Sequence, residues 1–174
     1  MDNDLHAVVK NADVLVLAVP SAFLKSTLDQ LDKAELYGKT IFSAVKGIVP
    51  ESNQIVGEFL FQHWDLAEAD FGVICGPCHA EEVAMERLSY LTIACQQQVK
   101  AQAMGAALNG RSLKTTLSDD IYGTEYGAIL KNVVAEAVKG GTILFTNTRE
   151  QCDEIAEQLE KFGVKYAMYR RSEE

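Results

Sequence analysis

The chain has 174 residues, of which 48% are hydrophobic and 24% charged, and its formal net charge is −9. This length and composition are those of a globular protein with one or two domains. The negative charge argues against nucleic acid as the main partner, because a phosphate backbone is bound by basic surfaces. No apolar run approaches the roughly 18 residues needed to span a membrane, and the polar start MDNDLHAVVK is unlike a signal peptide. The sequence therefore predicts a cytoplasmic protein without a membrane span.

The first half of the chain alternates apolar runs with segments of helical spacing. The run ADVLVLAVPS (12–21) is typical of a strand buried on both faces of a sheet, and AFLKSTLDQL follows with helical spacing. GKTIFSAVKGI predicts a second strand, and a helix is expected to open at Pro50–Ser52. FGVICGP predicts a third buried strand, and HAEEVAMER a short helix.

The next segments continue this alternation. SYLTIAC and SLKTTLS are strand candidates on either side of the helical QVKAQAMGAAL. The segment TEYGAILKNVVAEAV (124–138) predicts a helix whose apolar stripe faces the core. The stripe consists of Tyr126, Ile129, Leu130, Val133, Val134, Ala137 and Val138. Such an order of elements predicts an α/β fold with a parallel or mixed sheet.

Three predicted strands end in residues suited to binding an anion. In α/β sheets, ligands bind beyond the carboxyl ends of the strands. The three ends are Val19-Pro20-Ser21, Lys46-Gly47 and Gly76-Pro77-Cys78. One lysine and two tight turns could hold a phosphate or a dinucleotide there, although ordinary loop formation explains the same residues.

The stretch Cys-Gly-Pro-Cys-His at 75–79 matches three chemistries, none of which the rest of the chain supports. A thioredoxin-type dithiol is expected to have an aromatic residue before the first cysteine and a later cis-proline, but Ile74 precedes Cys75 and Pro77 is the last proline. Haem attachment normally needs an exported chain. Zinc needs three or four well-spaced ligands. A turn shaped by Gly76 and Pro77 remains, with all four cysteines reduced (Cys75, Cys78, Cys95 and Cys152).

Lys131 lies at the border of the apolar stripe of the predicted 124–138 helix. The residues about one turn away are small, Gly127, Ala128 and Ala135, and Asn132 follows directly. Small neighbours leave room for a ligand, and partial desolvation would lower the pKa of the lysine toward acid–base chemistry. The alternative is a lysine that extends its ammonium group from an amphipathic helix into water.

Four blocks together resemble one family. ADVLVLAVPSAFL, SAVKGIVPE, GPCHAEEVAMERLSYLTIA and SDDIYGTEYGAILKNVVA are similar, in order and spacing, to the bacterial NAD(P)-dependent glycerol-3-phosphate dehydrogenases, over roughly residues 5 to 137. The resemblance implies a partial Rossmann-like sheet with flanking helices. It also implies hydride transfer between NAD or NADP and dihydroxyacetone phosphate or sn-glycerol 3-phosphate, in phospholipid biosynthesis and carbohydrate metabolism.

The resemblance also assigns roles to individual residues. Lys131 matches the family's catalytic lysine, and Asn132 lies beside it. Lys46 matches a lysine that contacts both cofactor and substrate. The turn that holds the substrate matches Gly76, with Cys78 where the family commonly has Ser or Thr. Pro20 and Ala80 match positions near the cofactor.

The chain also departs from the family pattern. No G-x-G-x-x-G loop occurs for the pyrophosphate, and the family's helical domain after the lysine helix is not found. A truncated frame is therefore expected, with impaired activity. The expected domains are a truncated Rossmann-like domain over 1–138 and a βαβ unit over 139–174. That last segment weakly resembles a helicase RecA-like unit, but no G-x-x-x-x-G-K-[ST] sequence supports ATP hydrolysis.

Expected partners are a phosphorylated small molecule and, still open, a second copy in a homodimer. Neither a metal site nor nucleic-acid binding is expected. A non-catalytic α/β fragment or interaction module is the alternative function, and a helicase-derived nucleic-acid binder is a weaker one.

Overall fold

A computed structural model of the chain describes residues 4–78 and 80–138, and for 131–138 it describes the backbone only. The chain divides into two compact units, 1–128 and 129–174. All the strands in the described part of the chain lie in the first unit. The boundary predicted at residue 138 stays a prediction, and the predicted βαβ unit and Cys152 lie outside the described residues. No helix in the described part of the chain has the length and hydrophobicity to cross a membrane.

Strands and helices alternate along the chain much as predicted. The elements, in order, are α1 (Leu5–Lys10), β1 (Val14–Leu17), α2 (Ser21–Leu28), the 3-10 helix η1 (Lys33–Leu36), β2 (Thr40–Ser43), α3 (Val56–His63), the 3-10 helix η2 (Glu68–Asp70), β3 (Phe71–Cys75), α4 (Ala80–Ala84), β4 (Ser89–Cys95), α5 (Gln98–Leu108), β5 (Leu113–Ser118) and α6 (Ile121–Val138).

The described strands form one five-stranded sheet in the order β1-β2-β3-β4-β5. β1, β2 and β3 are parallel to one another, β4 is antiparallel to β3, and β5 is parallel to β4. The parallel or mixed α/β sheet predicted from the sequence is confirmed.

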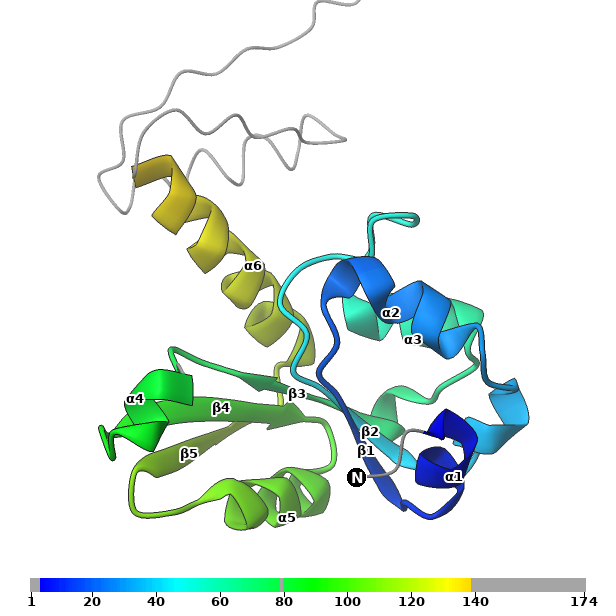
Figure 1. Ribbon diagram of the computed structural model, residues 1–174, viewed down its shortest axis with the longest axis horizontal. Coiled ribbons are helices and arrows are strands. Elements are labelled where there is room, and N and C mark those ends of the chain that lie inside the picture. Colours follow the sequence, from blue (N-terminus) through cyan, green and yellow to red (C-terminus); the bar gives the residue numbers. More distant parts are fainter. Residues whose placement is uncertain (1–3, 79, 139–174) are drawn as a thin grey trace, which may run out of the picture. The chain divides into compact units, whose positions relative to one another are not determined.

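Each face of this sheet has its own apolar core, because alternate residues of a strand point to opposite faces. On one face, Ile41, Phe71 and Val73 pack with residues of α1, α2, α3 and the start of α6. On the other face, Phe42 and Ile93 pack with α5. Figure 1 shows α2 and α3 on one side of the strands and α5 on the other.

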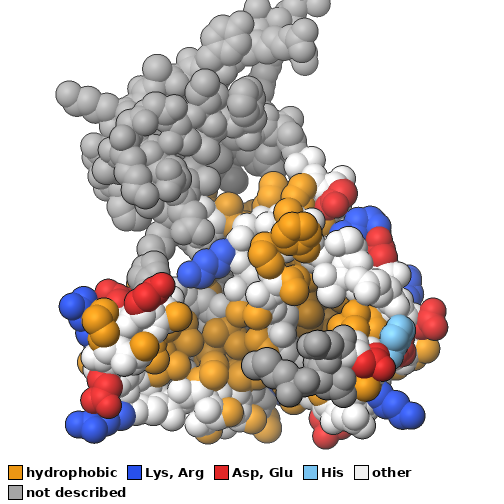
Figure 2. Space-filling view, in the orientation of Figure 1, with side chains coloured by type: hydrophobic (Ala, Val, Ile, Leu, Met, Phe, Trp, Pro, Cys, Tyr) orange, Lys and Arg blue, Asp and Glu red, His pale blue; other side chains and the backbone are white. Residues whose placement is uncertain are grey.

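The prediction that β1 is buried on both faces was wrong. Val14 is 48% exposed and Val16 is 49% exposed, while Leu15 and Leu17 pack against the larger core. The reason is the position of β1 at one end of the described sheet, where α5 does not reach. Figure 2 shows other hydrophobic side chains gathered over the strands between α4 and α5, so this face is only partly covered.

The predicted helix start at Pro50–Ser52 was also wrong. Val49 forms an antiparallel bridge with Gln54, Asn53 has a φ of 54°, and α3 begins only at Val56. Both Val49 and Ile55 are almost fully buried. The short bridged loop therefore places two apolar anchors in the core, and tertiary packing overrides the local helix signal.

The apolar stripe predicted for the 124–138 helix is only partly correct. Tyr126 is 44% exposed, and its hydroxyl donates to Glu58 Oε1 at 3.4 Å. The buried face at the start of α6 consists instead of Ile121 and Glu125, one helical turn apart. Helix α1, which was not predicted, starts where the Asp4 side chain accepts hydrogen bonds from the backbone N–H groups of its first turn.

Gly72 in the middle of β3 provides a test of this packing. A Cβ there would overlap the Phe42 ring and lie 2.9 Å from the Ala94 carbonyl oxygen. We expect Gly72→Ala to lower the free energy of unfolding by about 1–3 kcal/mol, since the strands on both sides must shift. Chemical denaturation measures this. Gly110→Ala is the control, because nothing lies within 4 Å of that position, and an equal loss there would contradict the packing argument.

Candidate functional site at the carboxyl edge of the sheet

The parallel pairing of β1, β2 and β3 brings three predicted ligand-binding segments to one edge of the sheet. Leu17 is in register with Ser43, and Ser43 with Val73. The segments that leave these three strands therefore start side by side. The sequence predicted this common edge from strand order alone.

The segments after β1 and β2 are in contact. Gly47 has a φ of 120°, a conformation that favours glycine, and a Cβ there would lie 3.2 Å from Ser21 Oγ. Pro20 is the N-cap of α2, which no side chain caps. Lys46 is exposed, and no ion pair holds its ammonium group among the described residues. A loop that carries a cation thus contacts a helix N-terminus, an arrangement suited to an anionic ligand.

The segment after β3 turns sharply beside β4. A Cβ on Gly76 would overlap the Tyr90 carbonyl oxygen and lie 3.0 Å from Leu91 Cα, so only glycine allows this close approach. The Cys78 backbone N–H donates to the Gly76 carbonyl at 2.9 Å. Ala80 is exposed at the start of α4. Cys75 and Cys78 are half-buried and Cys95 is buried; that the cysteines are reduced stays a prediction.

No group of three or more His, Cys, Asp or Glu side chains within the described residues has a geometry that could hold a metal ion. His79, the last residue of the Cys-Gly-Pro-Cys-His stretch, lies outside those residues.

The two residues assigned to the catalytic helix are placed only by their backbone. Lys131 and Asn132 lie within α6, as predicted, in the part of that helix whose side chains are not described. Whether the Lys131 ammonium group meets Lys46 at one pocket stays a prediction.

Glu125, which the sequence analysis missed, is a buried carboxyl on the first half of α6. Only 6% of the residue is exposed. Its Oε2 accepts a hydrogen bond from the Gly57 backbone N–H at 3.1 Å, in the first turn of α3. A Cβ on Gly57 would lie 2.9 Å from the same oxygen, so the glycine makes room for the carboxyl. The sequence contained one signal that could have predicted this buried carboxyl: a glutamate lies one turn after Ile121, on the apolar face of the helix.

The surroundings of Glu125 favour its neutral form. Its pKa is raised to about 7, chiefly by burial and to a smaller extent by the nearby charge of Glu58. The backbone N–H groups of Gly57 and Val56 act in the opposite direction, because they stabilise the carboxylate. Burial dominates, so this carboxyl exchanges its proton near neutral pH.

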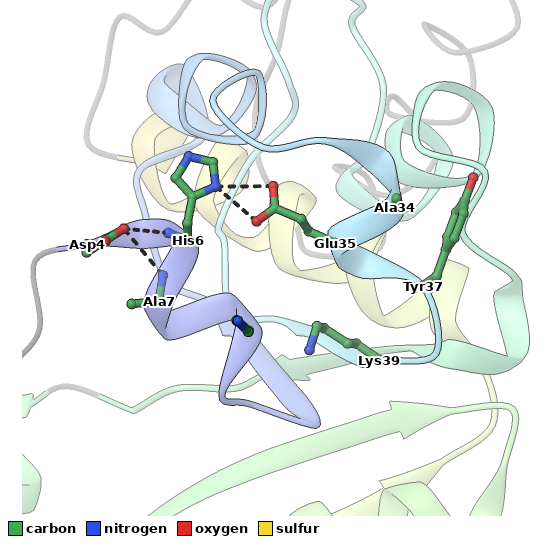
Figure 3. A pocket seen from close by; sticks show the side chains of 8 residues that line it. Asp4, His6, Ala7, Ala34, Glu35, Tyr37 and Lys39 are labelled. Atoms are coloured by element: carbon green, nitrogen blue, oxygen red, sulfur yellow. Dashed lines mark hydrogen bonds and ion pairs between the residues drawn. The ribbon is translucent and has the colours of Figure 1, made fainter.

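A cavity of about 540 Å³ lies away from the carboxyl edge. It is lined by residues that precede β1 and β2, including Lys10 and Lys39, and so lies beyond the amino ends of these strands. Figure 3 shows His6 of α1 pointing toward Glu35 of η1. Their side chains meet at 2.9 Å, and this carboxylate raises the pKa of His6. None of the predicted site residues lines this cavity.

A mixed α/β sheet whose first three strands are parallel, with candidate ligand-binding turns at their carboxyl ends, is the arrangement of Rossmann-like folds. Solved structures with this fold include the GPDH of Dunaliella salina, with a TM-score of 0.70 and 23% identity over 92% of this chain and 28% of that one. The glycerol-3-phosphate dehydrogenase of Coxiella burnetii gives 0.68 and 21%, over 93% of this chain and 51% of that one.

Sequence comparison identifies the family. Residues 1–101 match the sequence model of a protein family, the NAD-dependent glycerol-3-phosphate dehydrogenase N-terminus. A glycerol-3-phosphate dehydrogenase [NAD(P)+] of Oceanobacillus iheyensis is 33% identical over 133 residues, 76% of this chain and 39% of that protein. One from Pseudomonas fluorescens is 37% identical over 134 residues, 76% of this chain and 38% of that protein.

The chain therefore belongs to the NAD-dependent glycerol-3-phosphate dehydrogenase family. It spans about two-fifths of the length of these curated relatives.

The Glu125 environment predicts a pH-dependent stability. Its folded pKa of about 7 lies above its unfolded value, so the native state binds the extra proton between roughly pH 4.5 and 7. The free energy of unfolding should then fall as pH rises through this window, by up to about 3 kcal/mol. Glu125→Gln removes the titration and should flatten the slope, as measured by denaturation at several pH values.

The control for this experiment is Glu81→Gln, which changes an exposed carboxyl at the start of α4. In this variant the free energy of unfolding should depend on pH with the same slope as in the chain without substitutions. The slope is compared rather than the absolute stability, since the glutamine amide brings a new N–H₂ group into a buried site. An unchanged slope in Glu125→Gln would show that this carboxyl does not titrate in the window.

Proposed function

We propose that this chain provides the substrate side of a glycerol-3-phosphate dehydrogenase. Its reaction is hydride transfer between NAD(P)H and dihydroxyacetone phosphate or sn-glycerol 3-phosphate. The main support is the carboxyl edge. Lys46, which has no ion pair with any described residue, lies there in a loop whose next residue, Gly47, contacts Ser21 at the start of α2. The family match covers these residues and the Gly76 turn.

Each proposed residue has a role that its chemistry allows. Lys46 attracts the substrate phosphate by charge-assisted hydrogen bonds and also contacts the cofactor. Gly76 permits the close turn against β4 that presents backbone groups and Cys78 to the substrate. Lys131 holds the proton that the carbonyl oxygen gains on reduction, and Asn132 contacts the substrate beside it.

The residues at this edge fit the nicotinamide side of NAD or NADP. Pro20 and Ala80 are exposed where β1 and β3 lead into α2 and α4, and the Gly47 turn lets the backbone approach a ligand closely. The bound cofactor would supply the hydride. The pyrophosphate is held in such folds by a G-x-G-x-x-G loop, a sequence that this chain does not contain. We therefore propose that the chain alone turns over poorly or not at all.

Titration with sn-glycerol 3-phosphate tests the proposed site without requiring turnover. Lys46→Ala should weaken binding about tenfold, the loss of one charge-assisted hydrogen bond to a phosphate, and Lys131→Ala should also weaken it. Lys10→Ala is the matched control, because this lysine is exposed beyond the opposite edge of the sheet. Isothermal titration calorimetry gives the three affinities.

Two results would count against the proposal. If both Lys46→Ala and Lys131→Ala bind sn-glycerol 3-phosphate with unchanged affinity, these lysines do not bind the ligand and the proposed site is wrong. Rapid NADH oxidation with dihydroxyacetone phosphate, abolished by Lys131→Ala, would confirm the site but contradict the expected impairment.

An interaction module is the second candidate function, favoured by the exposure of Val14 and Val16 on β1. An apolar strand at the end of a sheet can pair with a strand of another chain. We also propose that the chain forms a homodimer and that it is located in the cytoplasm.

Light scattering on the purified chain distinguishes these cases. Self-association through β1 predicts a dimer that Val14→Lys and Val16→Lys convert to a monomer, while Tyr37→Lys, on another exposed apolar residue, leaves it intact. If the chain is a monomer at all concentrations, the hypothesis of self-association through β1 is wrong.

A further inference from the structure

Glu125 connects two segments that the proposed function needs together. Its Oε2 accepts the hydrogen bond from the Gly57 backbone N–H at 3.1 Å. Gly57 lies in the first turn of α3, and α3 follows the loop that carries Lys46. Glu125 lies in α6, whose backbone continues without a break to Lys131 and beyond. One buried hydrogen bond therefore joins the Lys46 segment to the helix that carries Lys131.

The loop between β2 and α3 extends this contact toward Lys46. Val49 forms a bridge with Gln54 inside the loop, and both Val49 and Ile55 are almost fully buried. Closely packed segments transmit a displacement instead of absorbing it. A shift at the start of α3 therefore displaces the bridged loop as a unit.

Glu125 also acts as a cap for α3 from a distant part of the sequence. The N-cap residue of α3 is Ile55, whose apolar side chain cannot accept a hydrogen bond. The N–H groups in the first turn of a helix have no partner within the helix, and a neighbouring polar side chain usually binds one of them. Here the carboxyl of Glu125 binds the Gly57 N–H instead, so the start of α3 depends on α6.

The charged groups around Glu125 make this contact depend on its proton. Burial and, to a smaller extent, the charge of Glu58 in α3 raise its pKa. Two tyrosines of α6 bind the neighbouring carboxylates: the Tyr126 hydroxyl donates to Glu58 at 3.4 Å, and the Tyr122 hydroxyl donates to Glu68 of η2 at 2.9 Å. Among the described residues, no lysine, arginine or histidine forms an ion pair with Glu125. Ionisation therefore places a buried charge beside like charges, which weakens the contact between α3 and α6.

We propose that neutral Glu125 is a positioning residue for the phosphorylated ligand, because it fixes the Lys46 loop to the helix that carries Lys131. This inference rests on the proposed function. Glu125 is itself buried and acts through the two lysines. Affinity for sn-glycerol 3-phosphate should therefore fall as pH rises and Glu125 loses its proton.

Isothermal titration calorimetry with sn-glycerol 3-phosphate at pH 6 and pH 8 tests this on the whole chain. With a pKa of about 7 for Glu125, about one-tenth of the chains keep this proton at pH 8. Glu125→Gln stays neutral, so it should bind about as tightly as the unmodified chain at pH 6 and about tenfold more tightly at pH 8. The titration of the phosphate itself affects both chains equally and cancels in this ratio.

The matched control is Glu35→Gln, which changes a carboxyl at the amino edge that pairs with His6. Its affinity should follow that of the unmodified chain at both pH values. Glu58→Gln provides a second test that keeps the carboxyl at position 125 and serves if Glu125→Gln fails to fold by circular dichroism. Removing the charge of Glu58 lowers the pKa of Glu125, so the loss of affinity should begin at a lower pH, and an unchanged midpoint would contradict the inference.

The ratio of the two affinities separates this inference from the proposed function. If the unmodified chain and Glu125→Gln have the same ratio at both pH values, Glu125 does not position the ligand site. If neither chain binds the ligand at either pH, the proposed function is wrong instead, and hydrogen exchange without ligand decides whether the joint exists.

Hydrogen exchange is corrected for the intrinsic effect of pH on its rate. Protection of the amides in 47–57 and 121–128 should then fall together between pH 6 and pH 8 in the unmodified chain, but not in Glu125→Gln. An equal loss of protection along the whole chain would show a general structural role and overturn the inference.

Discussion

The parallel pairing of β1, β2 and β3 is the constraint on which the candidate site depends. With Leu17, Ser43 and Val73 in one register, the three segments that follow these strands must start at the same edge. An antiparallel β2 would carry Lys46 to the opposite edge, and no local sequence change could compensate. The cation, the helix N-terminus and the glycine turn are therefore brought together by sheet topology rather than by contacts among themselves.

The sequence predicted those features that depend on local pattern, and it missed those that depend on packing at a distance. The helix QVKAQAMGAAL and the strand SYLTIAC have the predicted bounds, because propensity and burial agree there. The start of α3 was misplaced because burial of Val49 outweighs the helix signal after Pro50. The exposure of Val14 depends on what lies beside β1, which periodicity within a strand does not reveal.

Glu125 shows why a buried charge cannot be inferred from spacing alone. A carboxyl on the apolar face of α6 would normally destabilise the core. Here Gly57 leaves space for the carboxyl and donates its backbone N–H to it, which stabilises the buried group. The missing Cβ at Gly57 and the carboxyl at Glu125 are 68 residues apart in sequence and form one structural unit. This hydrogen bond joins α6 to α3. The protonation state of the carboxyl therefore affects the stability of the packing between the start of α6 and α3.

The two edges of the sheet differ in the surroundings of their charged groups. At the amino edge His6 pairs with Glu35, and Lys39 donates to the Ala12 carbonyl at 2.6 Å, so these two cavity-lining groups already have partners within the fold. At the carboxyl edge the described residues leave Lys46 without an ion pair. A buried or paired charge has already lost its water, whereas binding an anion requires a cation whose electrostatic attraction is still available. Cavity size therefore points to the amino edge. The carboxyl edge instead places the Lys46-Gly47 loop against the start of α2, and for a phosphorylated ligand a cation-bearing loop beside a helix N-terminus is the physically relevant feature.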